Sequence, residues 1–296
     1  MNAEDNPVSR PEVPARGAGD AARAWQLLAL AAAAYLLLGL LGESERWVAA
    51  VPAWLALAIA LAAGGAFVAI AVAMVALICR LPLTWMAQLG LAAAFGAACA
   101  AARIAHISLL GDLLLVVAAT FVGALVSRVV RESNMLVPVV VAAAVVDTWG
   151  VYWGFVAEMS KRAPQVVKHF SATVPAATAV ETPVPLLGAV GIGDFLFMGL
   201  FVAAVYRLHM SARATLWALF VALLAVPVVF GLADILAGGP VVPALPGLPF
   251  LGLGVVVANW GHFRFSRAEK FALLYAAVAV GGVIGLAWAV KHALGG

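Results

Sequence analysis

The sequence predicts an all-α protein, a polytopic transmembrane helical bundle of about nine spans. Hydrophobic residues make up 66% of the 296 positions and charged residues only 10%, so a soluble domain of this composition would expose too much apolar surface to water. The apolar residues come in long runs without period-two alternation. This pattern favours membrane-spanning helices over an outer-membrane β-barrel, whose strands alternate.

The elements follow one another from an N-terminal tail to a C-terminal helix. Residues 1–23 mix Pro, Gly, Ala and charges of both signs without periodicity, which predicts a disordered tail. The candidate spans are residues 24–42, 49–79, 83–102, 107–127, 135–157, 186–206, 214–236, 243–260 and 271–291. The run at 49–79 is long for one crossing, and we interpret it as one tilted helix.

The charged residues indicate topology and no nucleic-acid surface. The 17 basic residues exceed the 14 acidic ones, but they occur one to three at a time at the ends of apolar runs. A cytoplasmic N-terminus puts 11 of the 17 inside and leaves six outside, which favours that orientation. The two cysteines and five histidines show no metal-ligand spacing, so the sequence predicts neither a metal site nor a cofactor.

Two aspartates lie within apolar runs, and these are the functional candidates. Asp194 follows Gly191-Ile192-Gly193 in the run 184–206, and Asp147 lies in the run 135–157. A carboxylate in a membrane span costs roughly 2.5–3.5 kcal/mol, so its presence indicates function. The two glycines leave room for another backbone or a substrate beside Asp194, and two close carboxylates can share a proton and activate water.

Asp112 and Asp234 receive a different interpretation. Both fall near the end of a predicted span, where a carboxylate can reach water. We therefore expect a structural role for these two acids.

A polar connection at residues 158–185 joins the two acid-bearing spans. Within it, residues 165–174 have a weak extended character, as do residues 240–242 farther along the chain. Two interpretations stay open for these stretches: plain loop, or a pair of short strands that captures a substrate segment by backbone pairing. The prolines at 243, 246 and 249 predict irregular backbone at the start of the eighth span, which suits a wall of the site.

The order of these motifs carries a family resemblance. Asp147, then Gly191-Ile192-Gly193-Asp194, then Pro243-Ala244-Leu245 on successive predicted helices resembles the presenilin and signal peptide peptidase family of intramembrane aspartyl proteases. The resemblance implies that Asp147 and Asp194 are the catalytic pair. It implies further that Gly191, Gly193, Pro243, Ala244 and Leu245 lie beside them and position substrate. Val146 stands where the family usually has tyrosine, and the predicted spans before Asp147 and after residue 260 differ in number from those of presenilins.

The resemblance also implies a division of the chain and an activity. The tail at 1–23 precedes N-terminal transmembrane helices at 24–134, a catalytic transmembrane core at 135–260 and an additional C-terminal helix within 261–296. The expected activity is endoproteolysis of single-span transmembrane substrates by two aspartates and water, without a cofactor. The alternative is a proton-coupled transporter or channel that uses the same two aspartates as a proton relay. The arginine-rich basic set and heavy Ala and Gly usage indicate a prokaryotic plasma membrane, and the sequence predicts no particular accessory subunit or oligomeric state.

Overall fold

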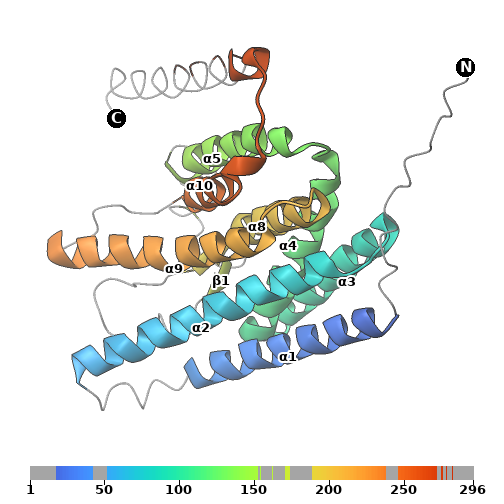
Figure 1. Cartoon of the computed structure of the whole chain (residues 1–296). Helices are drawn as coiled ribbons and strands as arrows, with labels where there is room; N and C mark the ends of the chain where they lie inside the picture. Colours follow the sequence, from blue (N-terminus) through green and yellow to red (C-terminus); the bar gives the residue numbers. More distant parts are fainter. Residues whose placement is uncertain are drawn as a thin grey trace, which may run out of the picture.

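The described part of the chain forms a bundle of apolar helices with a small two-stranded sheet (Figure 1). The computed structural model describes residues 18–42, 52–152, 171–173, 189–237 and 246–271, with isolated positions 154, 162, 275, 278 and 282. Its main elements are α1 (Ala18–Gly42), α2 (Ala53–Arg80), α3 (Trp85–Ile104), α4 (Ser108–Val126), α5 (Leu136–Tyr152), β1 (Ser171–Thr173), β2 (Ala189–Gly191), α8 (Ile192–Arg207), α9 (Ala212–Ala237) and α10 (Leu248–Ala258). In the described ranges, six helices (α1 to α5 and α9) are long and apolar enough to cross a membrane. The predicted all-α class and the multi-pass membrane bundle are confirmed.

The first half of the bundle follows the predicted spans closely. α1 begins at Ala18, inside the predicted tail of residues 1–23, because a run rich in alanine continues the helix in the N-terminal direction. The run at 49–79 forms one helix, α2, as expected. That helix ends at Arg80 because Pro82 disfavours helical backbone at Leu81. Thr84 then starts α3 by accepting a hydrogen bond from the N–H of Ala87 at 3.3 Å.

Two predicted spans begin later than the sequence indicates. The span predicted at 186–206 starts as α8 only at Ile192, because Ala189–Gly191 form a strand instead of a helical turn. The span predicted at 243–260 is the 11-residue α10, which begins at Leu248. Its length is about 16 Å, well short of a hydrocarbon core of about 30 Å. The predicted span at 271–291 lies almost entirely outside the described residues.

The small sheet shows that part of the predicted extended stretch at residues 165–174 is a strand. β1 falls inside the run 165–174 and pairs antiparallel with β2, with Ser171 opposite Gly191. Its partner strand was predicted as part of a membrane helix, so that prediction was wrong for Ala189–Gly191. The other extended stretch, residues 240–242, lies outside the described residues.

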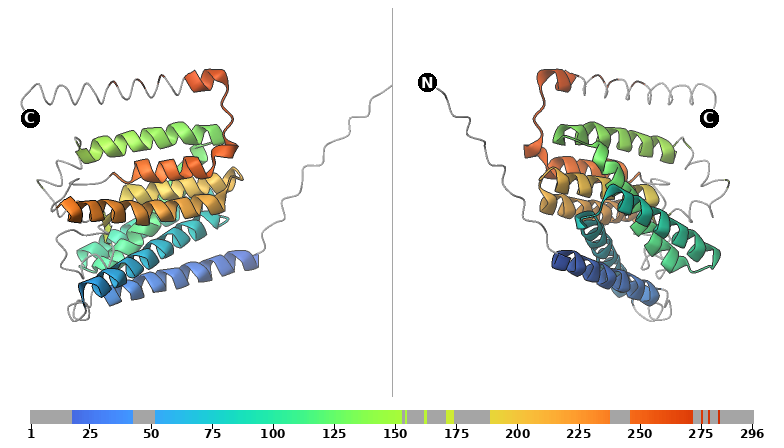
Figure 2. Two further views of the ribbon diagram at one scale, coloured as in Figure 1. Left: turned by 60° about the vertical axis from the view of Figure 1, so that its left-hand side comes forward. Right: turned by 90° about the vertical axis from the view of Figure 1, so that its right-hand side faces the viewer.

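The centre of the bundle is the contact between α4 and α8. A Cβ on Gly199 of α8 would lie 2.6 Å from the carbonyl oxygen of Thr120, and a Cβ on Gly123 of α4 would lie 2.8 Å from the amide nitrogen of Leu200. The two helices therefore pack backbone against backbone, as small residues allow in membranes. The three views place α1 and α5 on opposite sides of this pair (Figures 1 and 2).

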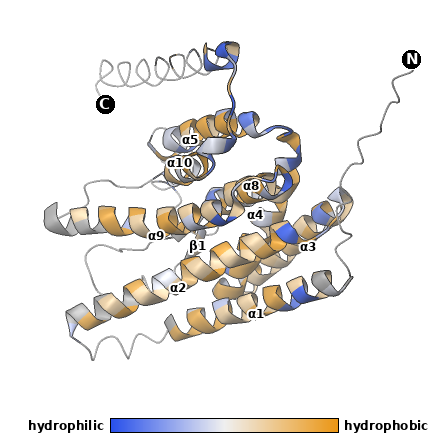
Figure 3. Cartoon of the chain, viewed as in Figure 1, coloured by the Kyte–Doolittle hydropathy of each residue, from blue (hydrophilic) through white to orange (hydrophobic). Residues whose placement is uncertain are grey.

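The outer faces of the helices are apolar as well. Leu30, Leu37 and Leu40 of α1 and Trp217 of α9 are all more than half exposed. Figure 3 shows hydrophobic residues along the outward sides of the long helices. Such continuous apolar surface suits contact with lipid tails and not with water.

Candidate active site

Asp194 lies in the first turn of α8, directly after the strand β2. Its carboxylate oxygen Oδ2 accepts a hydrogen bond from the backbone N–H of Gly191, the residue before the helix, at 3.2 Å. A carboxylate here satisfies one of the otherwise unpaired donors and interacts favourably with the helix dipole. The sequence placed Asp194 near the middle of a long span; it instead caps the start of a short one.

Asp147 lies in the second half of α5 and reaches a different helix start. Its Oδ2 accepts a hydrogen bond from the backbone N–H of Leu248, the first residue of α10, at 2.9 Å. That N–H has no partner within α10, so the carboxylate satisfies it. The side chain is half-buried. Asp147 thus joins α5 to the segment that follows the predicted Pro243-Ala244-Leu245 motif.

The two carboxylates meet at the same pair of residues, Gly247 and Leu248. A Cβ on Gly247 would lie 2.6 Å from Oδ1 and 3.1 Å from Oδ2 of Asp194. Asp147 accepts a hydrogen bond from the adjacent N–H of Leu248, so both carboxylates lie at the start of α10. We call Asp147 and Asp194 the aspartate dyad. Two carboxylates that converge on one helix start can take and give a proton on opposite sides of one reacting group.

Gly247 is a site residue that the sequence interpretation missed. Its backbone is ordinary right-handed helical, with φ −81° and ψ −37°, so its conformation does not require glycine. The requirement is space, because the Asp194 carboxylate occupies the position of a side chain. The only signal in the sequence was its place directly after Pro246, at the end of the proline-rich stretch.

The other predicted site residues divide into three groups. Gly191 lies at the site as predicted, since it precedes α8 and donates to Asp194. At Gly193, no described atom lies within 4 Å of the position of a Cβ, so the described part of the fold leaves this side of the helix start open. The remaining three, Pro243, Ala244 and Leu245, lie outside the described residues. Their neighbour Pro246 is buried and directly precedes Gly247.

We expect Gly247→Ala to reduce activity strongly while the protein stays folded. The added methyl group would displace the Asp194 carboxylate, and a misplacement of about 1 Å can cost roughly a hundredfold in rate. The measurements are the initial rate of cleavage of a labelled transmembrane reporter helix, the activity that the family resemblance implies, and the melting temperature in detergent. Gly261→Ala is the matched control, because no described atom lies within 4 Å of a Cβ there. Equal rates for both variants would contradict the packing role of Gly247.

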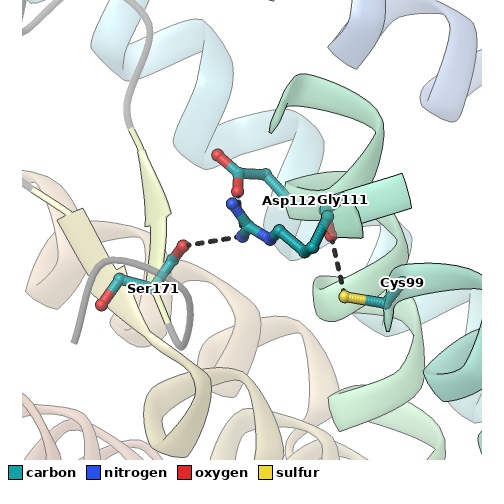
Figure 4. Close-up of polar contacts among 5 residues, drawn as sticks. Cys99, Gly111, Asp112 and Ser171 are labelled. Carbon is teal, nitrogen blue, oxygen red and sulfur yellow. Dashed lines mark hydrogen bonds and ion pairs between the residues drawn. The ribbon is translucent and has the colours of Figure 1, made fainter. Parts of the chain in front are cut away.

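A buried ion pair supports the sheet that leads into Asp194. Arg103 at the end of α3 pairs with Asp112 near the start of α4, and Asp112 is only 4% exposed. The same guanidinium donates to the carbonyl oxygen of Ser171 in β1 at 3.3 Å, as Figure 4 shows. Gly111 makes room for this side chain, since a Cβ there would lie 2.9 Å from Nε of Arg103. We call Arg103, Asp112 and Ser171 the β1 anchor.

The anchor gives Asp112 the structural role that the sequence predicts, but for another reason. The expectation was a carboxylate near a span end that reaches water, whereas the side chain is buried against a cation. The side chain of Asp234 lies outside what the structure describes.

Removal of one partner of the β1 anchor should destabilise the protein more than removal of both. Arg103→Gln leaves the buried Asp112 without its cation, and we expect a loss of about 2 kcal/mol in the free energy of unfolding. Adding Asp112→Asn should recover part of that loss, because the amide carries no charge. Thermal unfolding of the two single variants and the double variant measures this coupling. Strictly additive effects would contradict the pairing.

Neither a search for metal-ligand clusters nor comparison with known proteins assigns a further role to these residues. Across the described ranges, no three His, Cys, Asp or Glu side chains lie together as metal ligands would. Comparison with protein families, curated protein sequences and solved structures gives no match for the chain. The family resemblance therefore rests on the sequence motifs alone.

Proposed function

We propose that this protein is an intramembrane aspartyl endopeptidase that hydrolyses peptide bonds within transmembrane helices of other membrane proteins. One observation carries the proposal: Asp147 of α5 and Asp194 of α8, 47 positions apart in sequence, converge on Gly247 and Leu248 at the start of α10. The order of motifs that resembles the presenilin and signal peptide peptidase family supports the same activity.

The proposed mechanism uses the two carboxylates and one water. One carboxylate takes a proton from the water, whose oxygen adds to the carbonyl carbon of the substrate and forms a tetrahedral intermediate. The other carboxylic acid protonates the leaving nitrogen as the C–N bond breaks. The hydrogen bond from Leu248 to Asp147 and the one from Gly191 to Asp194 both end on Oδ2, and the proposed exchange of protons uses Oδ1 of each carboxylate. No covalent intermediate with the enzyme is needed.

The small sheet beside Asp194 supports a particular way of presenting substrate. A helical amide is hydrogen-bonded within its own helix, so the substrate must unwind before attack. β2 ends at Gly191, three positions before the catalytic carboxylate, and a two-stranded sheet has edges on which a third strand can pair. The side of Gly193 on which no described atom lies within 4 Å of a Cβ is at the same helix start. An extended substrate segment added to this sheet would lead directly to the dyad.

The proposal includes a membrane arrangement. We propose about nine crossings, in which the short helices α8 and α10 and the C-terminal segment at 271–291 join the six long helices. The basic residues favour a cytoplasmic N-terminus, and the composition favours a prokaryotic plasma membrane. Short helices at an intramembrane site are compatible with this arrangement because irregular backbone is tolerated where it lines a polar cavity.

Cleavage of a reporter helix tests the proposed function. The purified protein is mixed in liposomes with a labelled single-span transmembrane helix, and products are followed by mass spectrometry. We expect cleavage inside the apolar segment, enhanced when the reporter carries a helix-breaking residue near the cleavage site. No cleavage, together with proton flux across the same liposomes, would overturn the protease and favour the proton-coupled transporter or channel.

A further inference from the structure

A basic pocket lies at the end of the bundle where α2 and α8 end. It has a volume of about 340 Å³ and is lined by Arg80, Gln88, Arg128, Tyr206, Arg207 and His209, among others. None of the described residues that line it is acidic. Asp194 lies in the first turn of α8 and Arg207 is its last residue, so the pocket lies about 20 Å along the helix from the proposed catalytic pair.

Two of its arginines are held in position by uncharged groups. Arg128 donates through Nε to the side-chain oxygen of Gln88 at 3.0 Å and through Nη2 to the carbonyl oxygen of Leu83 at 3.1 Å. Arg207 donates to the backbone carbonyl oxygens of Ser127, Val130 and Arg128. Neither arginine has a carboxylate partner within the described ranges. Their like charges act on one another across the pocket wall.

Because Arg128 and Arg207 are held in place without a carboxylate partner in the described ranges, they favour the binding of a phosphate group. The described contacts use Nε and Nη2 of Arg128 and Nη1 and Nη2 of Arg207, so Nη1 of Arg128 and Nε of Arg207 can donate to phosphate oxygens. An arginine that is already oriented loses little freedom on binding. Arg80 adds a third cation, which lies 5.0 Å from the centre of the Tyr206 ring. The pocket thus has the charge and the donors for one phosphate group.

An apolar cavity continues from the basic pocket between α1 and α2. It has a volume of about 360 Å³ and shares Arg80 and Tyr206 with the basic pocket. Its other lining residues include Leu27, Leu77 and Arg23. A free phosphate would use only the basic pocket. A molecule with an anionic head and a hydrocarbon tail would use both.

We propose that these two cavities bind an anionic phospholipid, with its phosphate among Arg80, Arg128 and Arg207 and an acyl chain against Leu27 and Leu77. Basic pockets between membrane helices on the cytoplasmic side suit such head groups, and the distribution of basic residues favours the cytoplasm for this end of the bundle. The site does not depend on the proposed proteolysis, because lipid binding is measured without substrate.

Lipid retention by the full chain tests the proposal. Phosphatidylglycerol, phosphatidylcholine and inorganic phosphate are each titrated into the protein in non-ionic detergent, and bound species are counted by native mass spectrometry. We expect phosphatidylglycerol to bind at least about fivefold more tightly than phosphatidylcholine, from the charge on its head group. Equal binding of the two lipids would overturn the proposal. Displacement of the lipid by inorganic phosphate at millimolar concentration would also overturn the proposal, because it would show that the basic pocket binds free phosphate and not a lipid head group.

Variants locate the bound lipid. Arg128→Gln and, separately, Arg80→Gln should each weaken phosphatidylglycerol binding about fivefold, because both arginines line the basic pocket assigned to the phosphate. Arg131→Gln is the matched control, because Arg131 is an exposed arginine three positions from Arg128 that does not line either cavity. Melting temperatures without lipid show that each variant is folded, and Arg80→Gln tests the site if Arg128→Gln does not fold. An equal loss in Arg131→Gln would contradict the assigned site.

Discussion

Asp147→Asn and Asp194→Asn should each abolish cleavage of the reporter helix, with a loss of at least roughly a thousandfold. The amide keeps the size of the carboxyl group and can still accept the hydrogen bond from Leu248 or Gly191. It can neither take a proton from water nor give one to the leaving nitrogen. The fold should therefore survive while the chemistry is lost. Product formation and melting temperature, measured on the same samples, separate the two effects.

The control for this pair must be an acid outside both the dyad and the β1 anchor. Asp112→Asn is unsuitable, because Asp112 pairs with Arg103, which holds β1. Glu132→Gln is better, since Glu132 is exposed and its side chain makes no capping bond to the short helix that follows. We expect full activity for this variant. Cleavage by either aspartate variant at the rate of Glu132→Gln would refute the two-aspartate mechanism.

Gly123→Ala should destabilise the protein by at least about 3 kcal/mol, because it forces α4 and α8 apart. The new Cβ would meet backbone atoms of Leu196 and Leu200, which cannot move away as the end of a flexible side chain can. The shift would also carry Asp194, which lies in the first turn of α8. The measurement is thermal unfolding in detergent. We also expect a lower yield of folded protein.

Gly96→Ala is the matched control for the α4–α8 contact. Gly96 lies inside α3, and no described atom is within 4 Å of a Cβ there. Alanine is a better helix former than glycine, so this change should stabilise the protein by about 0.5–1 kcal/mol. Opposite signs for the two substitutions are the expected result. A neutral Gly123→Ala would show that α4 and α8 do not pack backbone against backbone.

The short elements show where local sequence reasoning fails. Ala189–Gly191 are as apolar as the helix that follows, so hydropathy alone assigns them to the same span. They form a strand because Ser171–Thr173, far away in the polar connection, pair with them. A two-stranded sheet depends on both partners at once. A run of three residues gives too little periodicity to predict one.

The sequence by itself determined the class of the protein, the course of most helices and the two aspartates as candidates. Apolar composition and run length are local properties, and a carboxylate within such a run is visible without a structure. Only the tertiary structure decided that Asp147 and Asp194 meet at Gly247 and Leu248, and that Arg103 ties Asp112 to β1. These contacts join residues from different helices, which pack closely at Gly123 and Gly199 between α4 and α8 and at Gly252 between α10 and α5. Packing of this kind depends on the shapes of several helices together, which no single stretch of sequence contains.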